Sequence, residues 1–473
     1  MTKPDLIKEA EERIKDLKKL QQAGLICLDG TFFPGIAYPP LTMYPPITEE
    51  VFLRGCQLLS DDLLDVYVHI PFCEKLCTFC HYPVKIKPSD DEIDYYLQVL
   101  EKEMDIYMRR LGVKIIKARS ILIGGGTTTY LNPAQLKRFL DFFTARLDLS
   151  ASPQFNVDLD PQTMLGSVGD ERLKIMKSYG VSRLTIGIQS FDDEILKRMN
   201  RPHNSEEAAK SIQRAKEAGF MVNIEFIFGY PGQTLDSWIE TIKKAISQET
   251  EEVQLYRLKL IPYGDHVGTI SGIYNARPED FLSVEETILM KRIAHLILNK
   301  KGYNQTLIRV FSKNPNIFSH YAQSLDWTLR DIISFGQSAF SSFNDRFSLN
   351  TPEFKEYYSY IERGKLPINR GLIRKKEDQI RWALALPLRC KEVNKAVFKK
   401  KTGVSLDSVF RKKIERLKKF DLAREDDKAL KLTELGRFFA DEISFQFYHS
   451  DYMPFPRTSY AEGELNPFND SKL

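Results

Sequence analysis

The sequence predicts an α/β fold, a partial barrel of parallel strands with helices between them, followed by a smaller helical domain. Six short runs that are apolar or alternating have the pattern of buried strands: 65–70, 119–123, 154–159, 183–188, 221–228 and 253–260. Longer helical patterns separate them, for example at 91–110, 132–147, 205–218 and 234–247. Strands separated by helices pair in parallel through right-handed crossovers. Six such units therefore predict an open (β/α)6 barrel with its site at the carboxyl ends of the strands.

Two segments precede the first strand. Residues 4–22 have apolar side chains at helical spacing in a charged background, which predicts an amphipathic helix that docks on the core. Residues 31–47 hold five prolines and predict a stiff, extended stretch. We expect the following division of the chain: 1–60 an N-terminal helix and proline-rich extension, 61–300 the barrel core, 301–374 a segment that completes or connects the core, 375–445 a winged-helix-like domain, and 446–473 a tail.

The C-terminal unit has its own pattern. Helical patterns around 377–386, 391–400 and 405–420 precede a short hairpin and a last helix from Thr433, which is typical of a winged helix. The basic runs 399–401 and 411–413 raise nucleic-acid binding as a hypothesis. Acidic residues interleave with them, so a solvated helix face is favoured over a nucleic-acid surface.

Composition places the chain among soluble globular proteins. Of its 473 residues 42% are hydrophobic and 28% charged, and the formal charge is only +4, so bulk charge does not favour a nucleic acid or a membrane as the main partner. We find no apolar run long enough to cross a bilayer and no apolar leader at the start. Cys27, Cys56 and Cys390 are scattered, which is typical of reduced thiols, and we expect a cytoplasmic protein.

Three cysteines carry most of the chemical information. Cys73, Cys77 and Cys80 have the spacing C-x3-C-x2-C on a short loop directly after the first predicted strand. Three thiolates suit an iron–sulfur cluster that keeps one iron without a protein ligand. A structural zinc site would need a fourth ligand, for which adjacent His81 is awkwardly placed, and purely structural cysteines are the other alternative.

The cysteine loop and the motifs after it resemble the radical S-adenosylmethionine (SAM) enzymes. The motifs are, in order, Tyr67-Val68-His69-Ile70-Pro71-Phe72, Gly124-Gly125-Gly126-Thr127, Ile186-Gly187-Ile188-Gln189-Ser190-Phe191, Asn200-Arg201, and the run from Phe228 to Thr234. Within the superfamily the chain is similar to the subgroup around oxygen-independent coproporphyrinogen III dehydrogenase, from about residue 35 to about 445. The resemblance implies the (β/α)6 partial barrel, and a segment ending in Tyr44-Pro45 that lies against it.

The resemblance also implies cofactors and the residues that bind them. It implies a [4Fe–4S] cluster on Cys73, Cys77 and Cys80, and a SAM molecule; a second SAM is a further hypothesis. The SAM contacts it implies are Phe79 against the adenine, Gly125, Gly126 and Thr127 near the methionyl group, and Asp158, Gln189, Arg201 and Glu225. Related dehydrogenases carry Glu at the position of Asp158 and Asp at that of Glu225, so the two acids have exchanged lengths.

One departure from the dehydrogenases directs the choice of reaction. They carry a fourth cysteine where this chain has Tyr82, and an aromatic residue there is more similar to haem chaperones and to class C methyltransferases and cyclopropanases. We therefore expect a radical SAM enzyme in which a second SAM supplies a methyl or methylene group to an unsaturated small molecule or tetrapyrrole. Tyr67 and Tyr82 are the candidate catalytic residues for a proton or hydrogen relay.

Two alternatives remain open. The first is oxidative decarboxylation of the propionates of coproporphyrinogen III, and the second is a haem chaperone with His81, His69 or His203 as a candidate ligand. For the partners we expect an electron donor such as flavodoxin or ferredoxin, a monomeric state, no membrane and no nucleic acid.

Overall fold

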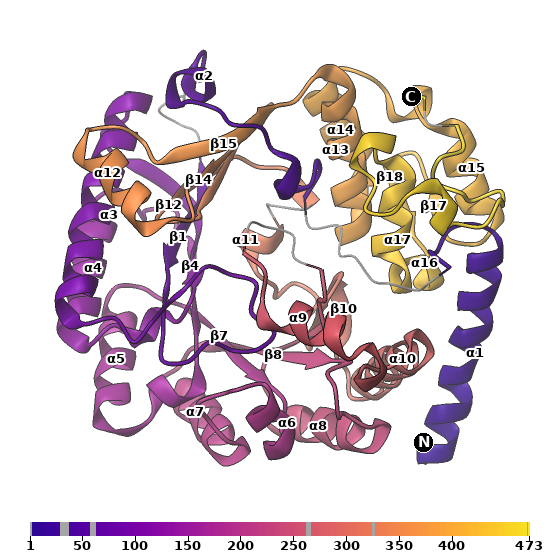
Figure 1. Cartoon of the computed structure of the whole chain (residues 1–473), viewed down its shortest axis with the longest axis horizontal. Helices are drawn as coiled ribbons and strands as arrows, with labels where there is room; N and C mark the ends of the chain where they lie inside the picture. The colour runs from indigo at the N-terminus through magenta and orange to yellow at the C-terminus, as the bar shows by residue number, and fades with distance from the viewer. Residues whose placement is uncertain (1, 29–36, 57–62, 262–265, 324–326, 471) are drawn as a thin grey trace.

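Six parallel strands form the core of one large, open sheet (Figure 1). The computed structural model describes the chain except residues 1, 29–36, 57–62, 262–265, 324–326 and 471. The parallel strands, in sheet order, are β1 (Leu64–Ile70), β4 (Ile116–Gly125), β6 (Gln154–Leu159), β7 (Arg183–Gln189), β8 (Met221–Phe228) and β9 (Glu252–Arg257). This order follows the chain, as right-handed crossovers require, and confirms the partial barrel.

Further strands extend both ends of the sheet. Beyond β9 lie the antiparallel strands β11 (Val310–Ser312) and β10 (Asn304–Leu307). Beyond β1 lies β12 (Ile332–Phe335), a seventh strand that pairs with β1 in parallel. It is followed by the antiparallel strands β13 (Phe340–Phe343), β14 (Arg346–Asn350) and β15 (Ile368–Ile373). Within the described residues the two ends do not pair, so the sheet stays open.

Helices cover the outer face of the sheet (Figure 1). They are α3 (Asp90–Leu111), α4 (Pro133–Thr144), α5 (Gly166–Ser178), α7 (Ser205–Glu217), α8 (Leu235–Ser247) and α10 (Val284–Lys300). All but α5 begin at a capping box, in which the side chains of the cap residue and of the third helical residue satisfy each other's backbone amides. These local signals explain why the sequence patterns placed the helices well.

The N-terminal helix α1 (Lys3–Gln22) joins the barrel to the C-terminal domain. Leu6 and Ala10 pack with Ile239 and Ile293 of the barrel helices, whereas Leu17 lies in the core of the C-terminal domain. The proline-rich segment continues this contact. Tyr44 stacks on Phe347 of β14 with 5.7 Å between ring centroids, and the Gly371 amide of β15 donates to the Pro45 carbonyl. Tyr44-Pro45 therefore lies against the antiparallel strands β14 and β15, and not against the parallel strands of the barrel core.

The C-terminal domain has the elements of a winged helix. It comprises α13 (Lys376–Cys390), β16 (Glu392–Asn394), α14 (Lys395–Thr402), α15 (Arg411–Lys419), β17 (Ala423–Glu425), β18 (Ala429–Leu432), α16 (Glu434–Phe438) and α17 (Ala440–Ser444). Its small sheet has the order β16-β18-β17. The helix expected from 405 begins only at Arg411, because residues 406–408 form a separate 3-10 turn.

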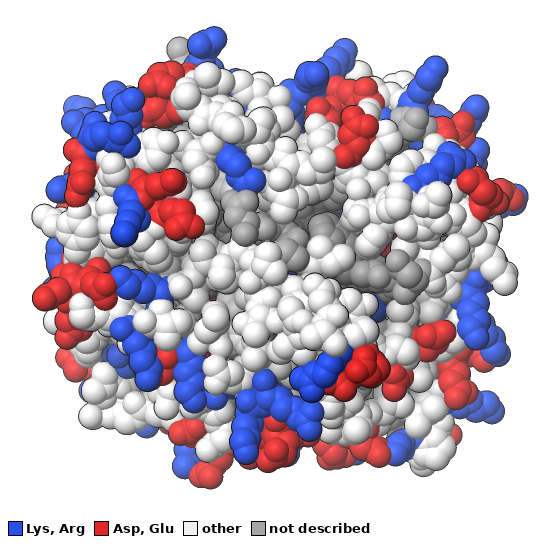
Figure 2. Space-filling model, in the orientation of Figure 1, with Lys and Arg blue, Asp and Glu red and all other residues white. Residues whose placement is uncertain are grey.

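The basic runs of this domain take part in its own packing. The Lys413 ammonium is buried and donates to the carbonyls of Gln446 and Pro467, and Arg411 pairs with Glu415 and Glu425. Figure 2 shows charges of both signs mixed around the edge of the visible face, without a broad patch of one sign. These contacts favour the interpretation that the basic runs form solvated, ion-paired helix faces over the interpretation that they form a nucleic-acid surface.

The described part of the tail is packed against the domain. The Lys413 ammonium of α15 donates to the carbonyl of Pro467, and the Leu465 side chain lies in the core of the domain. No helix among the described residues is long and apolar enough to cross a membrane.

Candidate functional site

The three predicted cluster ligands lie on one loop at the carboxyl end of β1. Cys73 ends the short strand β2 (Phe72–Cys73), which pairs in parallel with β3 (Lys85–Ile86) and so closes the loop at its base. The loop is anchored from the opposite side of the sheet. The Asn200 amide donates to the Leu76 carbonyl over 2.8 Å, and the Thr78 and Tyr230 hydroxyls lie 2.7 Å apart. These anchors hold the thiols over the barrel opening.

The thiols of this loop lie close enough to influence one another. Burial raises the pKa of Cys73 to about 12 and of Cys80 to about 11, and the Cys77 thiolate adds to both shifts. Buried thiolates without compensation are costly, and a bound iron cluster supplies the positive charge that they need. The donor set therefore fits a metal cluster.

The arrangement suits a cluster better than a single ion. His81 accepts at Nδ1 from the Gly268 amide over 2.9 Å, and its Nε2 lies 3.1 Å from the Lys259 carbonyl, so both ring nitrogens are occupied. Across the described residues no three His, Cys, Asp or Glu side chains converge on one ion position. A cubane binds each cysteine through a different iron, so it accepts thiols that are further apart than the ligands of one zinc ion.

Arg201 joins the cysteine loop to the end of β7. Its guanidinium donates to the Cys77 sulfur over 3.1 Å and to the Gly187 carbonyl over 2.7 Å, and it forms an ion pair with Asp160. Burial opposes the charge, but Asp160 and the thiolates outweigh it and raise the pKa of Arg201. Arg201 therefore stays charged beside the sulfur atoms.

The glycine segment after β4 lets the backbone approach the cysteine strand. An added Cβ at Gly126 would meet the carbonyl oxygen and amide nitrogen of Phe72 at 2.7 and 2.8 Å, so only glycine fits. The Gly126 and Thr127 amides donate to the carbonyls of Ile70 and Phe72. These two amides are therefore engaged with the backbone of the cysteine strand and are not available to a ligand.

Two carboxyl groups face each other across the middle of the sheet. Asp158 of β6 is paired with Thr185, and Glu225 of β8 with Gly187, so both flank β7 on the same face of the sheet. Burial raises the pKa of Asp158 to about 6; burial, and then the Asp158 charge, raise that of Glu225 to about 7. Two such groups in one site favour a cationic ligand.

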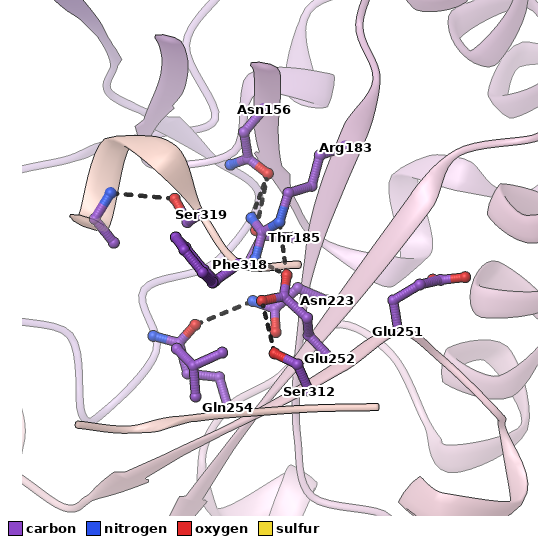
Figure 3. A network of polar contacts seen from close by, with 12 residues as sticks. Asn156, Arg183, Thr185, Asn223, Glu251, Glu252, Gln254, Ser312, Phe318 and Ser319 are labelled. Atoms are coloured by element: carbon purple, nitrogen blue, oxygen red, sulfur yellow. Dashed lines mark hydrogen bonds and ion pairs between the residues drawn. The ribbon is translucent and has the colours of Figure 1, made fainter. Parts of the chain in front are cut away.

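A polar network fixes this pair from below. Figure 3 shows the Arg183 guanidinium between Glu252 and Asn156, and Arg183 donates to them over 2.8 and 2.7 Å. The Asn156 amide in turn donates to Asp158 over 2.9 Å. On the neighbouring strand the Asn223 amide donates to Gln254 over 3.1 Å (Figure 3). The network fills the barrel at the amino ends of these strands and positions the acids above it.

The two candidate catalytic tyrosines have different surroundings. The Tyr67 hydroxyl lies 3.0 Å from His69 Nδ1, and burial raises its pKa well above the ordinary value. Burial also lowers the pKa of His69 to about 4, so the imidazole beside the phenol is neutral. Tyr82 is 45% exposed and lies near Tyr67, whose pKa it raises further. Both tyrosines therefore border the same space.

The remaining predicted contacts lie around this space. Phe79 packs on an apolar cluster that contains Ile227, Tyr230 and Leu258. Gln189 ends β7 with φ +70°, and its side-chain oxygen has no hydrogen-bond partner among the residues that the structure describes.

The sequence analysis missed three residues of the site. Tyr256 donates to Glu225 over 3.3 Å, and Gln254 donates to the Tyr256 hydroxyl. Asp160 holds Arg201. For Gln254 and Tyr256 the sequence held a signal: Glu252, Gln254 and Tyr256 alternate along a predicted strand, which places three polar groups on one face.

Comparison with known proteins identifies matching families for both parts of the chain. Residues 67–245 match the model of the radical SAM superfamily, and residues 375–439 match the HemN C-terminal domain. The heme chaperone HemW of Bacillus subtilis is 30% identical over 382 residues, which cover 80% of this chain and 97% of that protein. The oxygen-independent coproporphyrinogen III oxidase of Escherichia coli is 27% identical over 436 residues, covering 86% and 92%.

The structure of coproporphyrinogen III oxidase (HemN) from E. coli, described as a radical SAM enzyme, aligns with a TM-score of 0.73. It is 24% identical, and the alignment covers 85% of this chain and 93% of that one, so it bears on the fold. The names of these relatives favour the two alternatives of the sequence analysis over methyl or methylene transfer, which we do not carry forward.

Proposed function

We propose a function from the premise that this chain belongs to the radical SAM superfamily, in the HemN-like subgroup that contains the coproporphyrinogen III oxidases and HemW. It is a SAM-dependent enzyme that oxidatively decarboxylates the propionate side chains of a tetrapyrrole, coproporphyrinogen III in the first instance. The observation that carries the proposal is the convergence of the cysteine loop, Arg201 and the pair Asp158–Glu225 at one end of the barrel.

The residues have separate tasks in this proposal. Cys73, Cys77 and Cys80 would hold a [4Fe–4S] cluster, and Arg201 keeps a positive charge against the Cys77 sulfur. Each propionate that becomes a vinyl group loses carbon dioxide, one hydrogen atom and one electron, and a separate electron acceptor would take that electron. When bound, the cluster would supply the electron for reductive cleavage of SAM. An electron donor such as flavodoxin or ferredoxin would reduce it.

The chain's other residues bind and orient SAM. Asp158 and Glu225 attract its cationic groups, and Gln189 offers a side-chain oxygen that the protein leaves without a partner among the described residues. Phe79 offers its ring to the adenine. The chain at Gly125, Gly126 and Thr127 borders the methionyl end, with side chains kept small so that Phe72 can approach.

Tyr67 and Tyr82 are proposed to act on the substrate side. The Tyr67 phenol is hydrogen-bonded to neutral His69 and has a raised pKa, so it keeps its proton at neutral pH. Tyr82 is exposed enough to contact a bulky ligand.

A haem chaperone is the second candidate function. It is favoured by Tyr82 at the position where the dehydrogenases have a cysteine and by the likeness to HemW. Against it, the three histidines considered as haem ligands are all buried. His81 is bonded through both nitrogens, His69 faces Tyr67, and His203 Nε2 lies 3.2 Å from the Ile188 carbonyl.

Anaerobic turnover separates the candidates. Reconstituted protein should hold about four irons per chain and convert SAM to 5′-deoxyadenosine in the presence of a reductant. With coproporphyrinogen III it should release carbon dioxide and form vinyl products detectable by their fluorescence after oxidation. Stoichiometric haem binding without decarboxylation would support the chaperone instead, and S-adenosylhomocysteine as the main product would contradict both.

A further inference from the structure

His81 joins the last cluster ligand to two other parts of the barrel. It follows Cys80 directly and is only 7% exposed. The Gly268 amide donates to its Nδ1 over 2.9 Å, and its Nε2 lies 3.1 Å from the Lys259 carbonyl. Because an amide donates and a carbonyl accepts, the ring carries its proton on Nε2 and bridges the two backbone groups. Gly268 is the N-cap residue of the helix α9 (Thr269–Ala276), and Lys259 follows β9.

The start of α9 packs directly on the cysteine loop, near the centre of Figure 1. A Cβ added at Gly268 would lie 2.4 Å from the Cys80 carbonyl oxygen, about 1 Å too close for an ordinary contact, so only glycine fits. The Ile270 amide donates to the Thr78 carbonyl over 2.8 Å. The Ile270 side chain is buried in the apolar cluster on which Phe79 packs. One short segment therefore holds both Cys80 and Phe79.

The last two cysteines of the loop are tied to different strands. Cys77 is tied to the end of β7, because the Arg201 guanidinium donates to its sulfur over 3.1 Å and to a carbonyl of β7 over 2.7 Å. Cys80 is tied to the end of β9 through the neighbouring His81 ring. The strand β8, which carries Glu225, lies between these two strands. The loop is therefore fixed on both sides of the strand that presents one of the acids assigned to SAM.

The anchor on β9 also leads to that acid. Tyr256 of β9 donates to Glu225 over 3.3 Å, and Lys259, whose carbonyl faces His81, follows a few residues later in the chain. The path from Cys80 to Glu225 thus consists of two hydrogen bonds and one short stretch of backbone. Loss of the imidazole would remove this path, while the three thiols that hold the cluster would stay.

We propose that His81 and Gly268 are positioning residues, which set the position of the cluster relative to the acid pair that binds SAM. The inference rests on the proposed function only for its assignment of the cluster to the cysteines and of SAM to Asp158 and Glu225. A ligand that contacts the cluster and the acids at once needs both held at one spacing, and a displacement of about 1 Å weakens such a contact. The cluster itself needs only the three thiols, so uptake of iron is separate from positioning.

Hydrogen exchange of reconstituted full-length protein is the first test, because it does not depend on turnover. Gly268 and Ile270 occupy the N-cap and second positions of α9, where the backbone amides have no partner within the helix. Their protection therefore reports their bonds to His81 and Thr78. His81→Ala should speed exchange of the Gly268 amide about tenfold, as expected for one lost hydrogen bond. Gly272→Ala lies in the same helix, with nothing within 4 Å of the added Cβ, and should leave both amides protected.

SAM binding is the second test, measured by equilibrium dialysis under anaerobic conditions. His81→Ala and Gly268→Ala should hold as much iron per chain as the wild type and bind SAM about tenfold more weakly. The reduced cluster, followed by electron paramagnetic resonance, should need correspondingly more SAM to reach its SAM-bound spectrum. His81→Gln carries an amide that can donate to the Lys259 carbonyl, and should recover part of the affinity. Gly272→Ala should match the wild type.

A purely structural role of His81 predicts a different result, in which iron per chain falls while the chains that hold a cluster bind SAM normally. That result would overturn the inference, as would unprotected Gly268 and Ile270 amides in the wild type. If His81→Ala does not fold, Gly268→Ala and the exchange of the wild type decide.

Decarboxylation is measured on the same samples. Weakened SAM binding by the variants, without decarboxylation by the wild type, would refute the proposed reaction and keep the positioning role. Decarboxylation by the wild type, with SAM affinity unchanged in the variants, would do the reverse.

Discussion

The carboxyl pair should make SAM binding depend on pH in a range where most carboxylates do not titrate. The perturbation is Glu225→Gln, which keeps the size of the side chain and removes its charge. Burial and the Asp158 charge raise the pKa of Glu225 to about 7, so the group gains a proton as the pH falls from 8 to 6. A protonated carboxyl attracts a cationic ligand only weakly.

The expected size of the effect follows from the ionised fraction. With a pKa of about 7, roughly nine-tenths of Glu225 is ionised at pH 8 and roughly one-tenth at pH 6. If the ionised form is the one that binds, the apparent dissociation constant rises by about tenfold, or about 1.4 kcal/mol. Because Glu225→Gln has no ionised form at any pH, it should bind SAM at pH 8 at least as weakly as the wild type does at pH 6.

The assay is equilibrium dialysis of SAM against anaerobically reconstituted protein at pH 6, 7 and 8. Titration of SAM itself affects both proteins equally, so the ratio of the two dissociation constants isolates the contribution of Glu225. Asp158→Asn is the companion variant. It should lower the pKa of Glu225 by removing the neighbouring charge, and so move the pH dependence to lower pH. If neither variant changed SAM affinity or its pH profile, the assignment of both residues to SAM would be refuted.

Three further predictions concern the support of the site. Burial raises the pKa of Glu103 from 4.5 to about 7, so the contribution of Glu103 to stability is complete below about pH 4.5 and is lost as the pH rises to about 7, at a cost of about 3 kcal/mol. The unfolding temperature of Glu103→Gln should lack that decline with pH. Parallel pH profiles of the variant and the wild type would contradict the prediction. Gly126→Ala should displace the Phe72 backbone and lower iron per chain severalfold after reconstitution, whereas Gly272→Ala, with open space around it, should not. Arg201→Gln removes the donor to a cluster sulfur and should make the cluster harder to reduce in a redox titration followed by electron paramagnetic resonance; an unchanged midpoint would exclude contact with the cluster.

The local sequence pattern was sufficient to predict most of the fold. Every crossover helix except α5 begins where a capping residue and a hydrophobic period coincide, and each parallel strand is a short run that must be buried on both faces. The third helix of the C-terminal domain was misplaced because the 3-10 turn at 406–408 has the same apolar spacing over a short stretch. Likewise the strands of 304–373 have no periodicity strong enough to reveal that they extend the sheet on both sides.

The functional site was likewise predicted only in part from the sequence. Cysteine spacing and the ordered motifs marked residues that meet in space, because parallel strands bring their carboxyl ends to one edge. The occupancy of hydrogen-bonding groups was not predictable. The Gly126 amide is held by Ile70, and Asp160, which no motif singled out, holds Arg201.

The sequence by itself determined the class of this protein. Thiols three and four positions apart specify a metal cluster, and alternating strands and helices specify the scaffold that carries it, because both depend on covalent spacing. Only the tertiary structure decided which charges stand together. It placed two carboxyl groups across β7, and it placed the Arg201 guanidinium beside the Cys77 sulfur, from a distant segment of the chain. Electrostatic energy depends on distance and burial, neither of which a linear sequence contains.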